Sequence, residues 1–179
     1  GVDTKVFFRR NIPYQYSLCI IGAISKYKNS HKLFEAINSI TNIKLKILIV
    51  GNFDETMKDI NLSNHDVTHK SYVNHIELPN LYSSSKILCI ASYIEGMPKV
   101  VLEASACGTP VIGFEGSSID DIIINEKNGY IIKNNNFEDF KNKILLSINN
   151  DLTQMNIFGS NIIKEKYSLK NYAYRFDQV

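Results

Sequence analysis

Two carboxylates with seven residues between them stand on either side of a predicted helix start, Glu95 before it and Glu103 within it. Pro98 suits the first helical position, because its missing N–H would have no intrahelical partner there. Gly108 suits the position after the last turn, where a positive φ is often required. The backbone N–H groups of 96–100 are then free to bind a phosphate at the positive end of the helix dipole.

Carboxylates beside such a helix start do not bind phosphate, but they accept hydrogen bonds from sugar hydroxyls. The combination of carboxylates and free amides therefore predicts a nucleotide-sugar site. Each acid also has a simpler interpretation. Glu95 as a solvated acid would stabilise the helix dipole, and Glu103 would be a surface acid on the helix.

Short apolar runs alternate with amphipathic stretches along the whole chain. The expected strands are 18–24, 45–50, 87–91, 111–114 and 130–132, and the expected helices are 30–40, 76–84, 98–107, 119–124, 136–149, 151–167 and 169–176. Strands that are apolar on both faces, each followed by a helix, indicate a parallel sheet covered on both sides. Right-handed crossovers then give an α/β fold with a Rossmann-like, doubly wound parallel sheet.

The ends of these strands gather the candidate site. Ligands of doubly wound sheets bind outside the carboxyl ends of the strands. Gly22, Gly51 and the 93–98 loop all come at or just after strand ends. We therefore expect them to face one crevice.

Bulk composition is that of an ordinary globular protein. With 179 residues, 44% of them hydrophobic and 21% charged, the chain is expected to form a single domain over 1–179. A net charge of +2 without a basic run gives no reason to expect nucleic acid as a partner. The longest apolar runs, 18–24 and 87–91, are too short to cross a bilayer.

Cysteines and histidines offer little chemistry. Cys19, Cys89 and Cys107 lie in apolar contexts, which predicts buried free thiols rather than a disulfide. His65 and His69 are spaced i, i+4, but no cysteine or carboxylate clearly completes a zinc ligand set. No Asp-x-Asp pair is present to hold a metal on a diphosphate, so no metal site is expected.

Five sequence blocks occur in a fixed order along the chain. They are GAISKYKN at 22–29 with LFEAI at 33–37, ILIVG at 47–51, LYSSS at 81–85 with ILCI at 87–90, the carboxylate stretch at 93–110, and NGYII at 128–132. In this order they resemble the blocks of retaining GT-B glycosyltransferases of the glycosyl transferases group 1 family. The resemblance implies the C-terminal, donor-binding half of a GT-B fold.

The resemblance also implies roles for individual residues. Glu95 and Lys28 would be catalytic, Glu95 through the hydroxyls of the donor sugar and Lys28 through the diphosphate. The implied donor-binding residues are Glu103 at the ribose, Tyr72 and Val73 near the base, and Gly22, Gly96, Met97, Lys99 and Val100 around the diphosphate and sugar. A simpler alternative for Lys28 is a solvated charge in a cluster with Lys26 and Lys32.

Two positions depart from the family pattern. Ala23 stands where arginine is usual, so one of two expected phosphate cations is absent. Ser117 and Ser118 stand where Gly-Gly is usual. A degenerate domain that binds a nucleotide or a subunit without catalysis is therefore the second hypothesis. An epimerase or phosphorylase of the same architecture is the third, and the spacing of the carboxylates argues against it.

The substrates follow from the resemblance. We expect no cofactor, and a UDP- or GDP-sugar as the donor of a metal-independent transfer. A glycan, lipid or other acceptor would bind mainly to an N-terminal domain that is not in this chain, so the isolated domain is expected to be inactive. The expected location is cytoplasmic, and peripheral attachment of the parent enzyme to the inner face of a membrane stays open.

Overall fold

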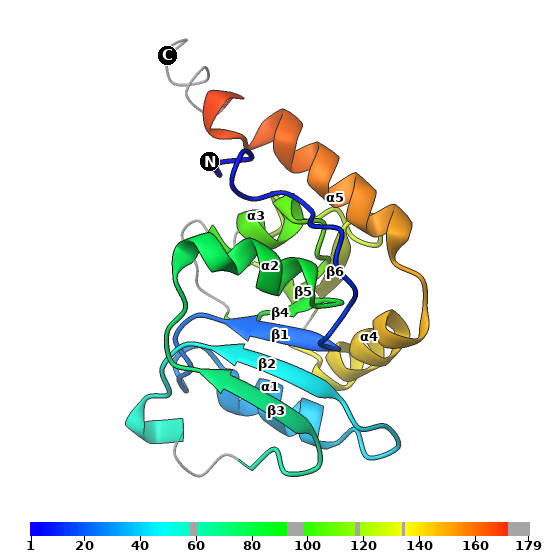
Figure 1. The fold of residues 1–179 in the computed structure, drawn as a ribbon. Helices are drawn as coiled ribbons and strands as arrows, with labels where there is room; N and C mark the ends of the chain where they lie inside the picture. Colours follow the sequence, from blue (N-terminus) through cyan, green and yellow to red (C-terminus); the bar gives the residue numbers. More distant parts are fainter. Residues whose placement is uncertain (58–60, 93–98, 117–118, 134, 172–179) are drawn as a thin grey trace.

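The computed structural model describes residues 1–57, 61–92, 99–116, 119–133 and 135–171. Within these residues one parallel sheet has the strand order β3-β2-β1-β4-β5-β6 (Figure 1). The strands are β1 Leu18–Ile21, β2 Lys46–Val50, β3 Asp66–Lys70, β4 Leu88–Cys89, β5 Val111–Phe114 and β6 Gly129–Ile132. The predicted Rossmann-like fold class is confirmed.

Helices cover both faces of this sheet. They are α1 Ser30–Asn38, α2 Leu78–Ser83, α3 Lys99–Ala106, α4 Phe137–Asn149 and α5 Thr153–Lys166, with short 3-10 turns η1 Glu55–Met57 and η2 His75–Glu77. α1 packs with α4 on one face, and α3 packs with α2 and α5 on the other (Figure 1). Each described helix is too short or too polar to traverse a lipid bilayer.

β2 shows why the strands are apolar on both faces. Ile47 and Ile49 belong to the core under α1 and α4, whereas Leu48 and Val50 belong to the core under α2, α3 and α5. Successive side chains of a strand point to opposite faces, so a sheet covered on both sides needs both sets to be apolar. The continuous apolar run in the sequence is the direct result.

Two predicted elements are corrected by the structure. β3 was not expected, and all five of its residues are exposed, so it lacks the apolar run on which strand recognition depends. The helix expected at 119–124 is instead a series of turns. The amide side chain of Asn128 holds them, since its oxygen accepts from Ile124 N at 2.7 Å and its nitrogen donates to Ile122 O at 3.1 Å. The helix expected at 169–176 lies mostly outside the described residues.

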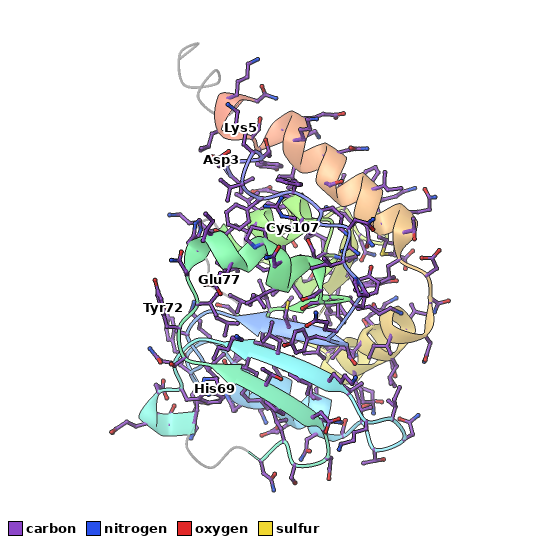
Figure 2. All side chains as sticks on the ribbon, in the orientation of Figure 1. Asp3, Lys5, His69, Tyr72, Glu77 and Cys107 are labelled. Atoms are coloured by element: carbon purple, nitrogen blue, oxygen red, sulfur yellow. The ribbon has the colours of Figure 1, made fainter. Side chains whose placement is uncertain are left out.

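The three cysteines are free and buried, as predicted. Cys107 lies at the end of α3, inside the molecule (Figure 2). Burial raises the pKa of the Cys19 thiol and that of the Cys107 thiol to about 12. Both groups are therefore neutral thiols at physiological pH, which suits core packing rather than nucleophilic chemistry.

Candidate functional site

A cavity of about 280 Å³ opens where the strand order reverses, between the carboxyl ends of β1 and β4. The chain leaves β1 for α1 on one face of the sheet and leaves β4 for α3 on the other, which creates a crevice between the two connections. The cavity is lined by Ile20, Ile21, Gly22, Ala23, Ile24, Lys28, Ser30, Leu33, Cys89, Ile90, Ala91, Ser92, Lys99 and Val100. Most of these residues are apolar, and two lysines and two buried serines are the polar exceptions.

Two glycines allow the ends of β1 and β2 to meet below this cavity. Gly22 has φ +126 and its N–H donates to Val50 O at 2.9 Å. Gly51 has φ +140, and a Cβ at Gly51 would lie 1.9 Å from the carbonyl oxygen of Gly22. Both positions need a residue without a side chain, so the predicted strand 18–24 ends early, at Ile21.

The N-terminus of α1 is held against the segment that follows β4. Asn29 has a left-handed conformation with φ 53, and its side-chain nitrogen donates to Ala91 O at 3.4 Å. Ser25 and Ser30 brace the same turn, because Ser25 N donates to Ser30 Oγ and Lys28 N donates to Ser25 Oγ, both at 3.2 Å. These bonds place Lys28 at the cavity wall.

The starts of α1 and α3 both border the cavity, and neither helix has an acidic residue in its first turn. Within these two described first turns, no acidic side chain offsets the positive end of either helix dipole. Lys28 and Lys99 add full positive charges beside them. An anion with several oxygens, such as a diphosphate, fits this electrostatic arrangement.

Glu103 lies one turn into α3 and is only 7% exposed, so its interpretation as a surface acid is wrong. Tyr82 Oη donates to Glu103 Oε2 at 3.0 Å, and His75 Nε2 lies 3.0 Å from Glu103 Oε1. Glu103 lines a second cavity, of about 220 Å³, together with Phe7, His75 and Lys99. Since Lys99 also lines the first cavity, it connects the two.

Burial raises the pKa of Tyr82 well above its ordinary value, and the negative charge of Glu103 adds to this shift. The Tyr82 hydroxyl therefore stays protonated, and can donate to the carboxylate at any physiological pH. The backbone carbonyl oxygen of Tyr82 accepts a hydrogen bond from Thr109 Oγ1 at 2.8 Å, which fixes α2 against the end of α3.

The structure brings together Gly22, Lys28, Lys99 and Val100 in the first cavity, and it places Glu103 in the second. Glu95, Gly96 and Met97 lie outside the described residues, as do Ser117 and Ser118. Tyr72 is 81% exposed at the margin of the molecule (Figure 2), and the neighbouring Val73 packs against the core.

Sequence reasoning missed His75 and Tyr82, the two partners of Glu103. The local sequence signal near His75 is Asn74, because an asparagine often caps a helical turn. Its Oδ1 accepts a hydrogen bond from Ile76 N at 3.2 Å. That signal marks the start of η2, but it says nothing about which acid His75 contacts.

Two of the other histidines, His65 and His69, have structural partners. Nε2 of the buried His65 lies 2.9 Å from Ile37 O, and its Nδ1 accepts from Leu45 N at 3.4 Å. His69 Nε2 lies 2.8 Å from Gly51 O. In the described part of the chain, no three His, Cys, Asp or Glu side chains are grouped so that they could hold a metal ion.

Comparison with known sequences gives a family match. The family model described as Glycosyl transferases group 1 matches residues 3–165. A glycosyltransferase of Haemophilus influenzae is 30% identical over 132 residues, which cover 70% of this chain and 36% of that protein. A glycosyltransferase of Methanocaldococcus jannaschii is 25% identical, covering 100% of this chain and 48% of that protein. The chain thus spans about a third to a half of the length of these relatives.

Solved structures share the fold. Sucrose-phosphate synthase from Thermosynechococcus elongatus superposes with a TM-score of 0.84 at 22% identity, covering 99% of this chain and 50% of that one. The C-terminal domain of a group 1 family protein from Francisella tularensis gives 0.80 at 22%, covering 94% of this chain and 100% of that one. An Anabaena protein solved with UDP and glucose gives 0.82 at 15%, covering 99% and 54%.

Proposed function

The chain belongs to the glycosyl transferases group 1 family, and on that premise we propose that it binds the nucleotide-sugar donor of a retaining glycosyltransferase. One observation carries this proposal. The starts of α1 and α3, with Lys28 and Lys99, converge on the cavity between β1 and β4, and Lys99 connects that cavity to the buried carboxylate of Glu103.

The donor would extend along these two cavities. The diphosphate would lie between Lys28 and Lys99, where the amides of the two helix starts add hydrogen bonds. The ribose would then reach Glu103, whose carboxylate accepts hydrogen bonds from hydroxyls. The donor sugar would lie beyond β4, and we propose Glu95 as the acid that contacts its hydroxyls.

UDP is the nucleotide that we propose first. The Anabaena protein contains UDP and glucose in the same fold, which supports a UDP-sugar over a GDP-sugar. The two cavities would bind the phosphates and the ribose, which both donors have in common, so the base has to be identified by experiment.

The transfer that we propose retains the configuration of the sugar. The bond between the sugar's anomeric carbon and the diphosphate breaks, and a bond to the acceptor oxygen forms on the same face. The acceptor proton moves to an oxygen of the departing diphosphate. Lys28 and Lys99 would stabilise the negative charge that develops on this leaving group.

A further domain would bind the acceptor. This proposal is supported by the length of the chain, which spans 36% and 48% of two relatives, and by its match to the whole of the Francisella tularensis C-terminal domain. We expect transfer to require that domain.

Isothermal titration of UDP, GDP and ADP into the folded chain tests the proposal. We expect micromolar to millimolar binding of one nucleotide, and about tenfold or greater weakening in Glu103→Ala, which removes a charged hydrogen-bond acceptor. Lys44→Met is the matched control, since Lys44 pairs on the surface with Asp66. Failure of all three nucleotides to bind would contradict a donor site.

Ala23 favours a second function. It lines the cavity at the position where the family usually has arginine, so the leaving group has one cation fewer. A domain that binds the nucleotide without supporting transfer is the function that this change suggests. Ala23→Arg should then tighten UDP binding by about tenfold, and an unchanged affinity would argue against an impaired phosphate site.

A further inference from the structure

The carboxylate of Glu103 is buried and meets a hydrogen-bond donor on each of its oxygens. Tyr82 comes from α2 and donates to Oε2, and His75 comes from η2 and lies against Oε1, each at 3.0 Å. A buried charge is costly unless it is hydrogen-bonded, so these contacts allow an ionised acid at this depth. They also hold the plane of the carboxylate from two sides.

The two partners are held differently, because the Tyr82 side chain is buried whereas 67% of the His75 side chain is exposed. The Tyr82 side chain is fully buried, and its hydroxyl stays protonated. His75 stands at the first position of η2, which the Asn74 side chain caps. The imidazole ring of His75 packs edge-to-face with the ring of Phe7, with 4.9 Å between the ring centroids and 64° between the planes. The continuous segment η2–α2, supported by Phe7 from the N-terminal part of the chain, therefore determines where the Glu103 oxygens point.

This arrangement leaves acceptor capacity for a ligand. An ionised carboxylate has about four acceptor positions, and Tyr82 and His75 occupy one on each oxygen. Among the described residues these are the contacts of the two oxygens, so each oxygen keeps one position with respect to them. Glu103 lines the 220 Å³ cavity that also reaches Lys99, on the side of the proposed diphosphate. Two neighbouring hydroxyls of one sugar ring match one remaining acceptor position on each oxygen.

We propose that His75 and Tyr82 are positioning residues for ribose recognition. They fix the Glu103 carboxylate so that its remaining acceptor positions take the 2′- and 3′-hydroxyls of the nucleotide together. This inference rests on the proposed function, because it takes the ligand of the site to be a ribonucleoside diphosphate. Beyond that function, it assigns to His75 and Tyr82 the preference of the site for ribonucleotides over deoxyribonucleotides.

The test compares UDP with 2′-deoxy-UDP, and GDP with 2′-deoxy-GDP, by titration into the folded chain. The unmodified chain should prefer the ribonucleotide about 10- to 100-fold, the value of a hydrogen bond to a charged group. Tyr82→Phe and His75→Leu should each reduce this preference to about threefold, mainly by weakening the ribonucleotide. His75→Gln keeps an N–H donor and should restore most of it.

Tyr130→Phe is the matched control, since it removes the same hydroxyl from a tyrosine of β6 and should leave the preference unchanged. Equal weakening of ribo- and deoxynucleotides in Tyr82→Phe and His75→Leu would overturn the inference and leave the proposed function intact. Tighter UDP binding in His75→Leu would do the same, because His75 would then compete with the ribose. Absence of any nucleotide binding by the unmodified chain would overturn both.

Discussion

Replacing Gly51 by alanine puts a methyl group where the ends of β1 and β2 meet. The new Cβ would lie 1.9 Å from the carbonyl oxygen of Gly22 and 2.8 Å from its carbonyl carbon. Carbon and oxygen atoms that are not bonded normally approach to about 3.3 Å, so one backbone has to move by more than about 1 Å. Gly51 also has φ +140, a conformation that costs a residue with a side chain about 1–3 kcal/mol.

The two effects act together on the central strands. The displacement would break the hydrogen bond from Gly22 N to Val50 O, which closes the end of the β1–β2 ladder. We therefore expect Gly51→Ala to lower the free energy of unfolding by about 4 kcal/mol or more. Because Gly22 lines the proposed phosphate cavity, the fraction that stays folded should also bind UDP more weakly.

Urea denaturation followed by circular dichroism measures the first effect, and titration with UDP the second. Gly116→Ala is the matched control, because Gly116 has φ +84 but a Cβ there would meet no atom within 4 Å. It should cost only the backbone strain, about 1–2 kcal/mol. If Gly51→Ala costs no more than this control, the close contact between the two strand ends is refuted.

Three further predictions concern charges and protons. Raising the pH from 8 to 10 should lower the free energy of unfolding by about 4 kcal/mol. The unfolded chain releases the protons of Cys19, Cys89 and Cys107 near pH 9, whereas burial raises the pKa of all three thiols well above that range in the folded chain. Urea titrations at both pH values measure this, and alanine at Cys19 and Cys107 should leave a smaller dependence. Lys86→Met should lower the free energy of unfolding by about 1–2 kcal/mol in the same assay. The Lys86 ammonium donates to Ile148 O at 2.5 Å and to Asn150 O at 3.1 Å, and so caps the end of α4. A loss below about 0.5 kcal/mol, the value of an exposed ion pair, would contradict this cap. Lys99→Met should weaken UDP binding about tenfold and reduce its salt dependence, and an unchanged salt slope would place Lys99 away from the phosphates.

Most of the sheet could be predicted because buried parallel strands leave a clear pattern. β2 sends Ile47 and Ile49 to one core and Leu48 and Val50 to the other, so its whole length reads as apolar. The rule that ligands bind at the carboxyl ends of such strands gathers Gly22, Gly51 and the 93–98 loop. Of these, Gly22 lines the first cavity and the 93–98 loop lies outside the described residues, while the roles of the lining residues stay predictions.

Other features leave no such pattern in the sequence. The segment 119–124 buries Ile119, Ile122 and Ile123 at helical spacing, although the chain only turns there. Asn128 lies a few residues beyond this segment and fixes its conformation through two side-chain hydrogen bonds. The contacts of Glu103 with Tyr82 and His75 span 21 and 28 residues, and they exist only because α2, η2 and α3 pack together. Local sequence cannot encode such a contact by itself.

The exposed strand β3 has a consequence for association between molecules. It forms one edge of the sheet, and the edge of a sheet offers unpaired backbone groups to any strand that approaches. Asp66 and Lys70 place charges of opposite sign at its two ends, and Lys44 adds a further charge beside Asp66 at 2.6 Å. Charged side chains on an edge strand disfavour the docking of a second sheet. The polar composition that hid β3 from sequence analysis therefore protects the folded chain against edge-to-edge aggregation.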